Sequence, residues 1–112
     1  MTNKARALGN GLENRVVTRA RKRGLAAWKQ PGSGVYADYP NDVVVSTLLG
    51  ECKVRSTLPS LAQMFEWLEY VESNARKKKG EFDGAFLVFN QKGGRKPKVM
   101  LDLDLFLKLL AE

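Results

Sequence analysis

The chain has 112 residues, 44% of them hydrophobic, a size that suits one compact domain rather than two independent cores. Its 19 lysines and arginines outnumber 12 acidic residues, and the net charge of +7 favours a polyanionic partner such as nucleic acid. The absence of histidine excludes serine–histidine and cysteine–histidine catalysis and the usual zinc sites.

The composition also predicts where the protein works. No apolar run approaches the roughly 20 residues that span a bilayer, and no signal peptide is predicted. Cys52 is the single cysteine, which excludes an internal disulfide and fits a reducing compartment. We therefore expect a single soluble domain over residues 1–112, in the cytoplasm of a bacterial, archaeal or phage-infected host cell.

Residues 5–23 form the first predicted helix, which ends before Gly24. Its apolar stripe at helical spacing consists of Leu12, Val16, Val17 and Ala20. Basic residues occupy another face. Glu13 lies beside the apolar stripe, a position that calls for a partner. From this helix alone, a structural ion pair and a functional carboxylate are both open.

The next segment predicts strands on either side of a long loop. Residues 25–29 are consistent with a short strand, and residues 30–41 are rich in turn formers. Loops of about a dozen residues in compact domains are uncommon and often functional. Residues 42–46 and 48–54 then predict two strands that pair antiparallel.

A second helix is predicted after Ser60, which forms a capping box with Gln63. Its core stripe consists of Leu61, Met64, Leu68, Val71 and Ala75. Residues 76–79 are basic, as suits the end of a helix, and Gly80 stops it. A second stripe consists of Gln63, Trp67, Tyr70 and Asn74.

The last part of the chain completes a mixed sheet. Residues 85–89 are apolar throughout, which predicts a strand covered on both faces, while Val99, Leu101 and Leu103 alternate as in a half-buried strand. A short helix follows over residues 104–111. The order α-β-β-β-α-β-β-α predicts an α/β fold with a mixed central β-sheet flanked by helices.

One group of charged residues predicts a metal site. Glu51 and Lys53 are two apart on a predicted strand, so their side chains share a face while Cys52 points to the other. Asp42 opens the adjacent strand and can lie close to Glu51 across the ladder. Two carboxylates of this kind suit Mg²⁺, and Mn²⁺ is expected to substitute. The ion can polarise a scissile phosphate and activate water, while Lys53 orients that water, and Glu13 can bind a second ion.

These residues resemble the PD-(D/E)xK nuclease superfamily, and most closely its small archaeal-type and phage Holliday junction resolvases. The matching motifs are Glu13 in residues 11–17, Ser33 in residues 31–34, Asp42 in residues 40–45, and Glu51-Cys-Lys53. The resemblance implies a restriction-endonuclease-like core in which Glu13, Asp42, Glu51 and Lys53 bind metal and activate water. It also implies that the backbone carbonyl of Cys52 coordinates the ion and that Ser33 engages the scissile strand.

One departure from this pattern leaves an alternative open. Asn41 separates Pro40 from Asp42, where the family usually has proline and aspartate in succession. Asp38 is therefore a possible substitute ligand. Asp42 is preferred because it borders the valine-rich strand. Gln63, on the helix after Lys53, either caps its own helix or faces the active site.

The basic residues predict contacts with DNA phosphates, which position DNA without reading its sequence. The predicted contacts are Arg15, Arg19, Lys22, Arg23, Lys29, Arg55, Lys92, Arg95 and Lys96. No segment remains for a recognition domain, so we expect selectivity for branched DNA, above all four-way junctions. Two symmetric cuts require a homodimer. Its surface is either the second stripe of the second helix or the apolar C-terminal helix with Leu105, Phe106 and Leu109, although both can equally be core.

Two rival functions are compatible with the same residues. The first is another nuclease of this superfamily, acting on flaps, forks or single strands. The second is a non-catalytic DNA-binding module on the same fold, against which the complete set of Asp42, Glu51 and Lys53 argues.

Overall fold

The computed structural model describes residues 3–31, 41–78 and 80–112. Within these ranges three helices and five strands follow one another in the predicted order. They are α1 (Asn3–Lys22), β1 (Ala27–Lys29), β2 (Val43–Val45), β3 (Leu48–Arg55), α2 (Leu61–Lys77), β4 (Gly84–Gln91), β5 (Lys98–Met100) and α3 (Leu103–Ala111). The predicted α/β fold, with a mixed central sheet flanked by helices, is confirmed.

The five strands form one sheet in the order β1-β2-β3-β4-β5. β1, β2 and β3 are joined antiparallel, as predicted for the valine-rich strand and its neighbour. β3 and β4 are parallel, and β5 returns antiparallel to β4. Because parallel neighbours need a crossover, α2 connects β3 to β4 across one face of the sheet. β3 therefore belongs both to the antiparallel half and to the parallel half.

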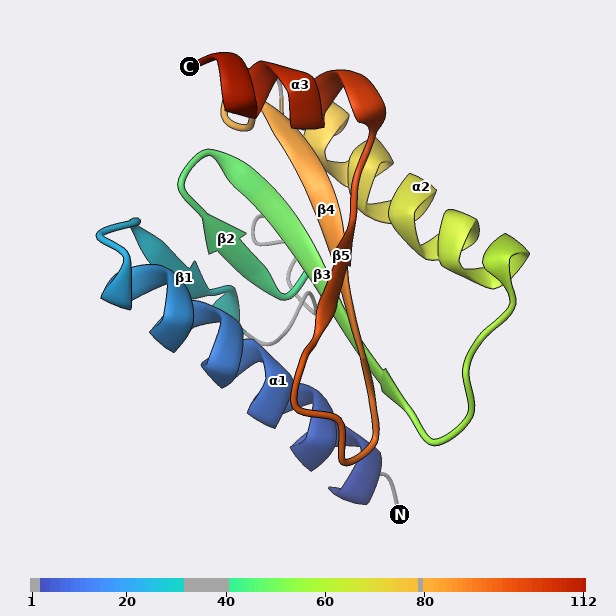
Figure 1. Cartoon of the computed structure of the whole chain (residues 1–112). Coiled ribbons are helices and arrows are strands. Elements are labelled where there is room, and N and C mark those ends of the chain that lie inside the picture. Colours follow the sequence, from blue (N-terminus) through green and yellow to red (C-terminus); the bar gives the residue numbers. More distant parts are fainter. Residues whose placement is uncertain (1–2, 32–40, 79) are drawn as a thin grey trace.

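α1 and α2 cover opposite faces of the sheet, and α3 lies across one end of it (Figure 1). On the α1 face the core consists of Leu12, Val17, Ala20, Ala27, Val43, Cys52, Phe86 and Val88. On the α2 face it consists of Val44, Leu49, Leu68, Val71, Ala75, Ala85 and Leu87. β4 is buried from Ala85 to Asn90 because both cores contact it, which confirms the predicted double coverage. In the described ranges, no helix is long and apolar enough to cross a membrane.

The boundary between the last strand and the last helix differs from the prediction. The alternating pattern extended the strand to Leu103, whereas β5 ends at Met100 and Leu103 is already helical and 66% exposed. Asp102 is the physical reason. Its carboxylate accepts the backbone N–H groups of Asp104 and Leu105 at 3.1 and 3.3 Å, so it caps a helix that begins at Leu103, one residue earlier than predicted.

Candidate active site

The candidate site lies where β2 and β3 separate. Their ladder ends at the pair Val43 and Gly50, and Asp42 stands one residue further, opposite Glu51. The backbone N–H of Asp42 still donates to the carbonyl of Gly50 at 3.0 Å. Its side chain then takes the place of a strand partner, because Asp42 Oδ2 accepts the backbone N–H of Cys52 at 2.8 Å. The predicted proximity of Asp42 to the Glu51 strand is thus present.

Glu51 and Lys53 share a face of β3, as their spacing predicted. Lys53 Nζ lies 3.1 Å from Glu51 Oε2, while the other carboxylate oxygen, Oε1, accepts from Asn41 Nδ2 at 2.7 Å. Glu51 is buried and the Lys53 side chain is 24% exposed, so the ammonium can be reached from solvent. A buried carboxylate with a partner at each oxygen has a fixed orientation.

Asp42 carries the strongest electrostatic perturbation of the site. Burial and then the charge of Glu51 raise its pKa from 3.8 to about 8, and the charge of Glu13 adds to this rise. The N–H of Cys52 and the charge of Lys53 act in the opposite direction but do not cancel it. Asp42 is therefore a buried carboxyl group under the influence of two other carboxylates, Glu51 and Glu13.

Glu13 and Cys52 approach this region from the α1 face. Glu13 is 3% exposed on α1, and its charge contributes to the raised pKa values of Asp42 and Cys52. Cys52 packs in the core on the α1 face, opposite to Glu51, as predicted. Burial is the main reason that the pKa of its thiol is raised, so this thiol stays protonated and unreactive.

Three further residues of this region were not predicted to belong to it. Asn41 donates to Glu51, and Asn74 Nδ2 donates to Asn41 Oδ1 at 2.9 Å. The ring centroid of Trp67 lies 5.4 Å from Lys53 Nζ and 5.0 Å from the guanidinium carbon of Arg55. Asn74 and Trp67 belong to the second stripe of α2, which is one of the two predicted dimer surfaces. The helical spacing of this stripe was the signal in the sequence that could have placed both residues at the site.

The donor set suits a hard divalent cation. Mg²⁺ is commonly held by one or two carboxylates and completes its shell with water and substrate phosphate, and Asp42 and Glu51 provide such a pair. Burial, and then the charge of Glu51, raise the pKa of Asp42, and a cation bound here would favour its ionised form. In the described part of the chain, no group of three or more His, Cys, Asp or Glu side chains is arranged to hold a metal ion. The fit therefore rests on the two strand carboxylates.

Two predicted candidates lie outside the described residues. Ser33 and Asp38 both fall within residues 32–40. Asp42, the preferred ligand, contacts the Glu51 strand through the backbone N–H of Cys52. Ser60 Oγ accepts the backbone N–H of Gln63 at 3.1 Å, so the predicted helix cap at Ser60 is confirmed.

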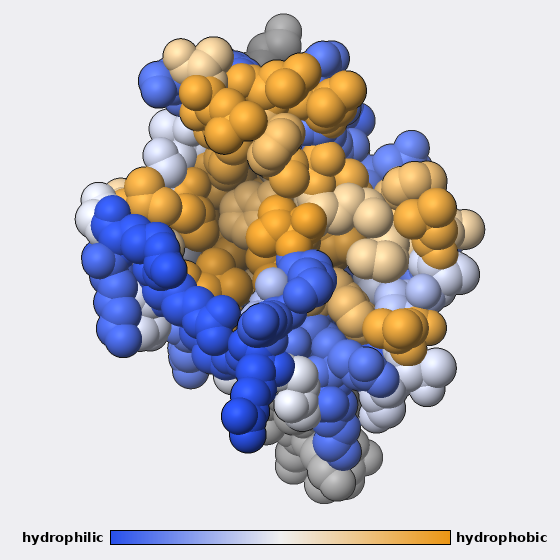
Figure 2. Space-filling view, viewed as in Figure 1, coloured by the Kyte–Doolittle hydropathy of each residue, from blue (hydrophilic) through white to orange (hydrophobic). Residues whose placement is uncertain are grey.

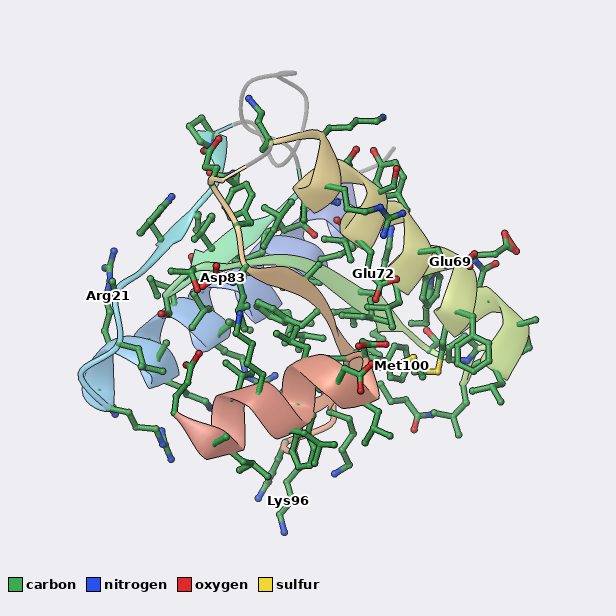
Figure 3. All side chains as sticks on the ribbon, turned by 90° about the horizontal axis from the view of Figure 1, so that it is seen from above. Arg21, Glu69, Glu72, Asp83, Lys96 and Met100 are labelled. Carbon is green, nitrogen blue, oxygen red and sulfur yellow. The ribbon has the colours of Figure 1, made fainter. Side chains whose placement is uncertain are left out.

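Several of the predicted DNA-contacting residues come together where α1 meets the turn 92–98. Arg15 donates to the backbone carbonyl of Arg95 at 3.3 Å and Arg19 to the same carbonyl at 3.4 Å, which joins α1 to the turn 92–98. We call α1 and this turn the basic surface. Among its described side chains the exposed cations are Arg19, Arg21, Lys22, Lys92, Arg95, Lys96 and Lys98, and the exposed Arg23 follows directly after α1. Lys96 projects away from the body of the protein (Figure 3). Lys29 and Arg55 are exposed on β1 and β3.

The geometry thus combines two buried strand carboxylates, a lysine in contact with one of them and a third carboxylate on α1. The strand carboxylates can bind a divalent cation, and the basic surface of α1 and the turn 92–98 can bind a polyanion. In comparisons of the chain with family models, curated proteins and solved structures, no match is found.

Proposed function

We propose that this protein is a Mg²⁺-dependent DNA endonuclease. One observation carries the proposal: Asp42 stands opposite Glu51 at the point where β2 leaves β3, with the Lys53 ammonium 3.1 Å from the Glu51 carboxylate. A structural surface ion pair would not need two buried carboxylates and a raised pKa beside it. The resemblance to PD-(D/E)xK nucleases supports the same assignment.

In this proposal Asp42 and Glu51 hold Mg²⁺ or Mn²⁺, together with the backbone carbonyl of Cys52. Bound Mg²⁺ supplies Lewis-acid polarisation of the scissile phosphate. Glu13 contributes negative charge from α1 and is the candidate for holding a second ion. Ser33 would engage the scissile strand.

Lys53 has two roles that its position supports. Its ammonium is close enough to Glu51 to share a water molecule with that carboxylate, which would orient the water toward the phosphate. Its positive charge also stabilises the charge that develops on the phosphate oxygens. Because Lys53 is partly exposed, the DNA backbone can approach it without unfolding the site.

The proposed substrate is branched DNA, with four-way junctions first. The basic surface provides phosphate contacts, which orient a duplex arm without reading bases. Processing of flaps, forks or single strands is the nearest alternative, and binding without cleavage is the other. A resolvase would act in DNA recombination and repair, in the cytoplasm of a bacterium or archaeon or of a phage-infected cell.

We further propose that the protein is a homodimer through α3 and the groove beside it. Figure 2 shows apolar side chains of α3 continuing into a hollow apolar face over the sheet, bounded by polar side chains of α1. The groove has a volume of about 300 Å³ between α1, the sheet and β5, with Arg15 and Arg19 at its rim. α3 carries Asp104 and Lys108 and is capped by Asp102 and Glu112, so its acidic ends can face the arginines at the groove rim of another copy.

The size of this surface supports a second copy as its occupant. Eleven residues line the groove and nine form α3, which approaches the roughly 20–30 residues per side found in stable interfaces. Groove and helix lie on one face, so a two-fold axis would bury both in each copy. The second stripe of α2, the other predicted dimer surface, is less suitable because Trp67 and Asn74 are engaged at the site.

The test is cleavage of a synthetic four-way junction, a flap, a fork and linear duplex of matched length, with and without Mg²⁺. The proposal expects paired nicks in the junction and little cutting of the duplex. Lys53→Ala is expected to abolish cleavage while junction affinity stays within about threefold, because the phosphate contacts lie elsewhere. Equal cutting of all substrates would overturn junction selectivity, and normal cutting by Lys53→Ala would overturn the site assignment.

A further inference from the structure

A chain of hydrogen bonds connects α2 to the proposed catalytic strand. Asn74, in the last turn of α2, donates to the side-chain oxygen of Asn41, and the side-chain nitrogen of Asn41 donates to Glu51 Oε1. Asn41 is buried and has a φ of 63°. Asparagine is among the few residues that tolerate this left-handed conformation. Asn41, which separates Pro40 from Asp42 in the sequence, is therefore hydrogen-bonded within the site.

The direction of these bonds is fixed by chemistry. An ionised carboxylate only accepts hydrogen bonds, so Asn41 must present its NH₂ group to Glu51. The oxygen of the Asn41 amide then faces α2 and needs a donor there. The NH₂ group of Asn74 is that donor. Without it, the Asn41 amide could rotate and turn its oxygen toward Glu51, where two acceptors would repel each other.

The same side of α2 also holds the lysine. Trp67 lies seven residues before Asn74, two helical turns away on the same side of the helix. Its ring lies beside the Lys53 ammonium at a distance at which a cation is attracted to an aromatic face. One helix therefore contacts both members of the Glu51–Lys53 pair, directly at Lys53 and through Asn41 at Glu51.

We propose that Asn74 and Trp67 are positioning residues, which hold Glu51 and Lys53 in the orientation that the reaction uses. This inference rests on the proposed nuclease function and deepens it. Asn74 keeps the Glu51 carboxylate fixed at Oε1 through Asn41, which leaves Oε2 for Lys53 and for a cation. Residues that orient metal ligands in this way typically change metal affinity or activity by about 10–100-fold when replaced.

The decisive comparison is Asn74→Asp against Asn74→Ala. Aspartate has nearly the same shape as asparagine but offers acceptors alone, so it would pull the NH₂ group of Asn41 away from Glu51. Alanine merely removes the donor. We expect kcat for junction cleavage to fall by about 10–100-fold in Asn74→Asp and by less in Asn74→Ala, with KM for DNA unchanged in both. If Asn74 only fills space, kcat should fall more in Asn74→Ala than in Asn74→Asp.

A second readout does not depend on activity. Calorimetric titration of the protein with Ca²⁺, which supports binding without requiring cleavage, should show about tenfold weaker binding for Asn74→Asp. Glu69→Gln is the matched control, because Glu69 is exposed on the outer side of α2 (Figure 3) and should match the wild type in both assays. Wild-type binding and kcat in Asn74→Asp would overturn the proposal.

Two outcomes are kept apart by this design. If the wild type neither binds Ca²⁺ nor cuts any branched DNA, the nuclease function fails, and the positioning role fails with it. If the wild type does both, the variants decide the role of Asn74 alone. Should Asn74→Asp fail to fold, the double variant Asn41→Ala with Asn74→Ala decides. If Asn74 acts only through Asn41, the double variant should lose no more cleavage activity than Asn41→Ala alone. Additive losses of activity would overturn the proposal.

Discussion

α2 and α3 have similar apolar patterns in the sequence, yet the fold uses them in opposite ways. α2 buries Leu68, Val71 and Ala75 against the sheet and directs a polar side toward the candidate site. All nine residues of α3 are described and none is buried, with Leu110 68% exposed. An apolar helix that its own chain does not cover indicates an interface with another molecule. In the functions proposed above, catalysis and assembly therefore involve different helices.

The largest expected effect lies on the α2 side. Glu51→Gln keeps the shape of the side chain but removes its charge, so we expect junction cleavage to fall by more than about 100-fold. The oligomeric state, measured by light scattering after size exclusion, should not change. If Glu51→Gln were no longer a dimer, the proposed division of roles between α2 and α3 would be wrong.

The converse variant acts on the α3 side. Phe106→Glu places a charge on the exposed apolar side of α3, and we expect the dimer to dissociate at concentrations at least about 100-fold higher than for the wild type. Single nicks should persist while paired nicks in the same junction become rare. Sedimentation velocity measures the first effect and a supercoiled cruciform plasmid the second. A Phe106→Glu protein that still sediments as a dimer would exclude α3 from the interface.

Asp42 predicts how stability responds to pH. In the folded metal-free protein its pKa is about 8, against an ordinary value of 3.8, so between these values the folded state keeps a proton that the unfolded state has lost. The free energy of unfolding should therefore decrease as pH rises from about 4 to about 8, by on the order of a few kcal/mol. Mg²⁺ should restore stability mainly at the alkaline end, because it binds the ionised carboxylate.

Urea denaturation at pH 5 and pH 8, with and without Mg²⁺, measures this effect. Asp42→Asn is the informative variant, because its amide oxygen can still accept from the Cys52 N–H while the titrating group is gone. It should lose both the pH dependence in this window and the response to Mg²⁺. If the free energy of unfolding of Asp42→Asn still decreases with pH as it does in the wild type, another group causes the pH dependence.

The smallest expected effect concerns neither helix but the core on the α1 face of the sheet. A Cβ at Gly50 would collide with the ring of Phe86 and with Val43, so Gly50→Ala should destabilise the protein by about 1–3 kcal/mol. Chemical denaturation measures this value. Gly11→Ala is the control, because a Cβ there meets no atom within 4 Å. Equal stability of the two variants would show that β2 and Phe86 can shift to make room.

The sequence predicted the order of elements and the relation between Asp42, Glu51 and Lys53, because both depend on local periodicity. The spacing of two on β3 and a tight hairpin with β2 bring these three side chains together. Asn74 was not predicted as part of the site because it is 33 residues from Asn41, and this contact exists only once α2 has crossed the sheet. The end of β5 was wrong because the Asp102 cap outweighed the apolar alternation.

The position of β3 between the two halves of the sheet has a consequence for folding. Asp42 and Glu51 meet through a short hairpin, a local contact that can form early. Glu13 and Asn74 reach the same place from α1 and α2, which come from distant parts of the chain and pack on opposite faces. The two strand carboxylates are therefore fully oriented only when the whole domain has folded. A partly folded chain would hold the pair without its supports, so the proposed cleavage would require the complete fold.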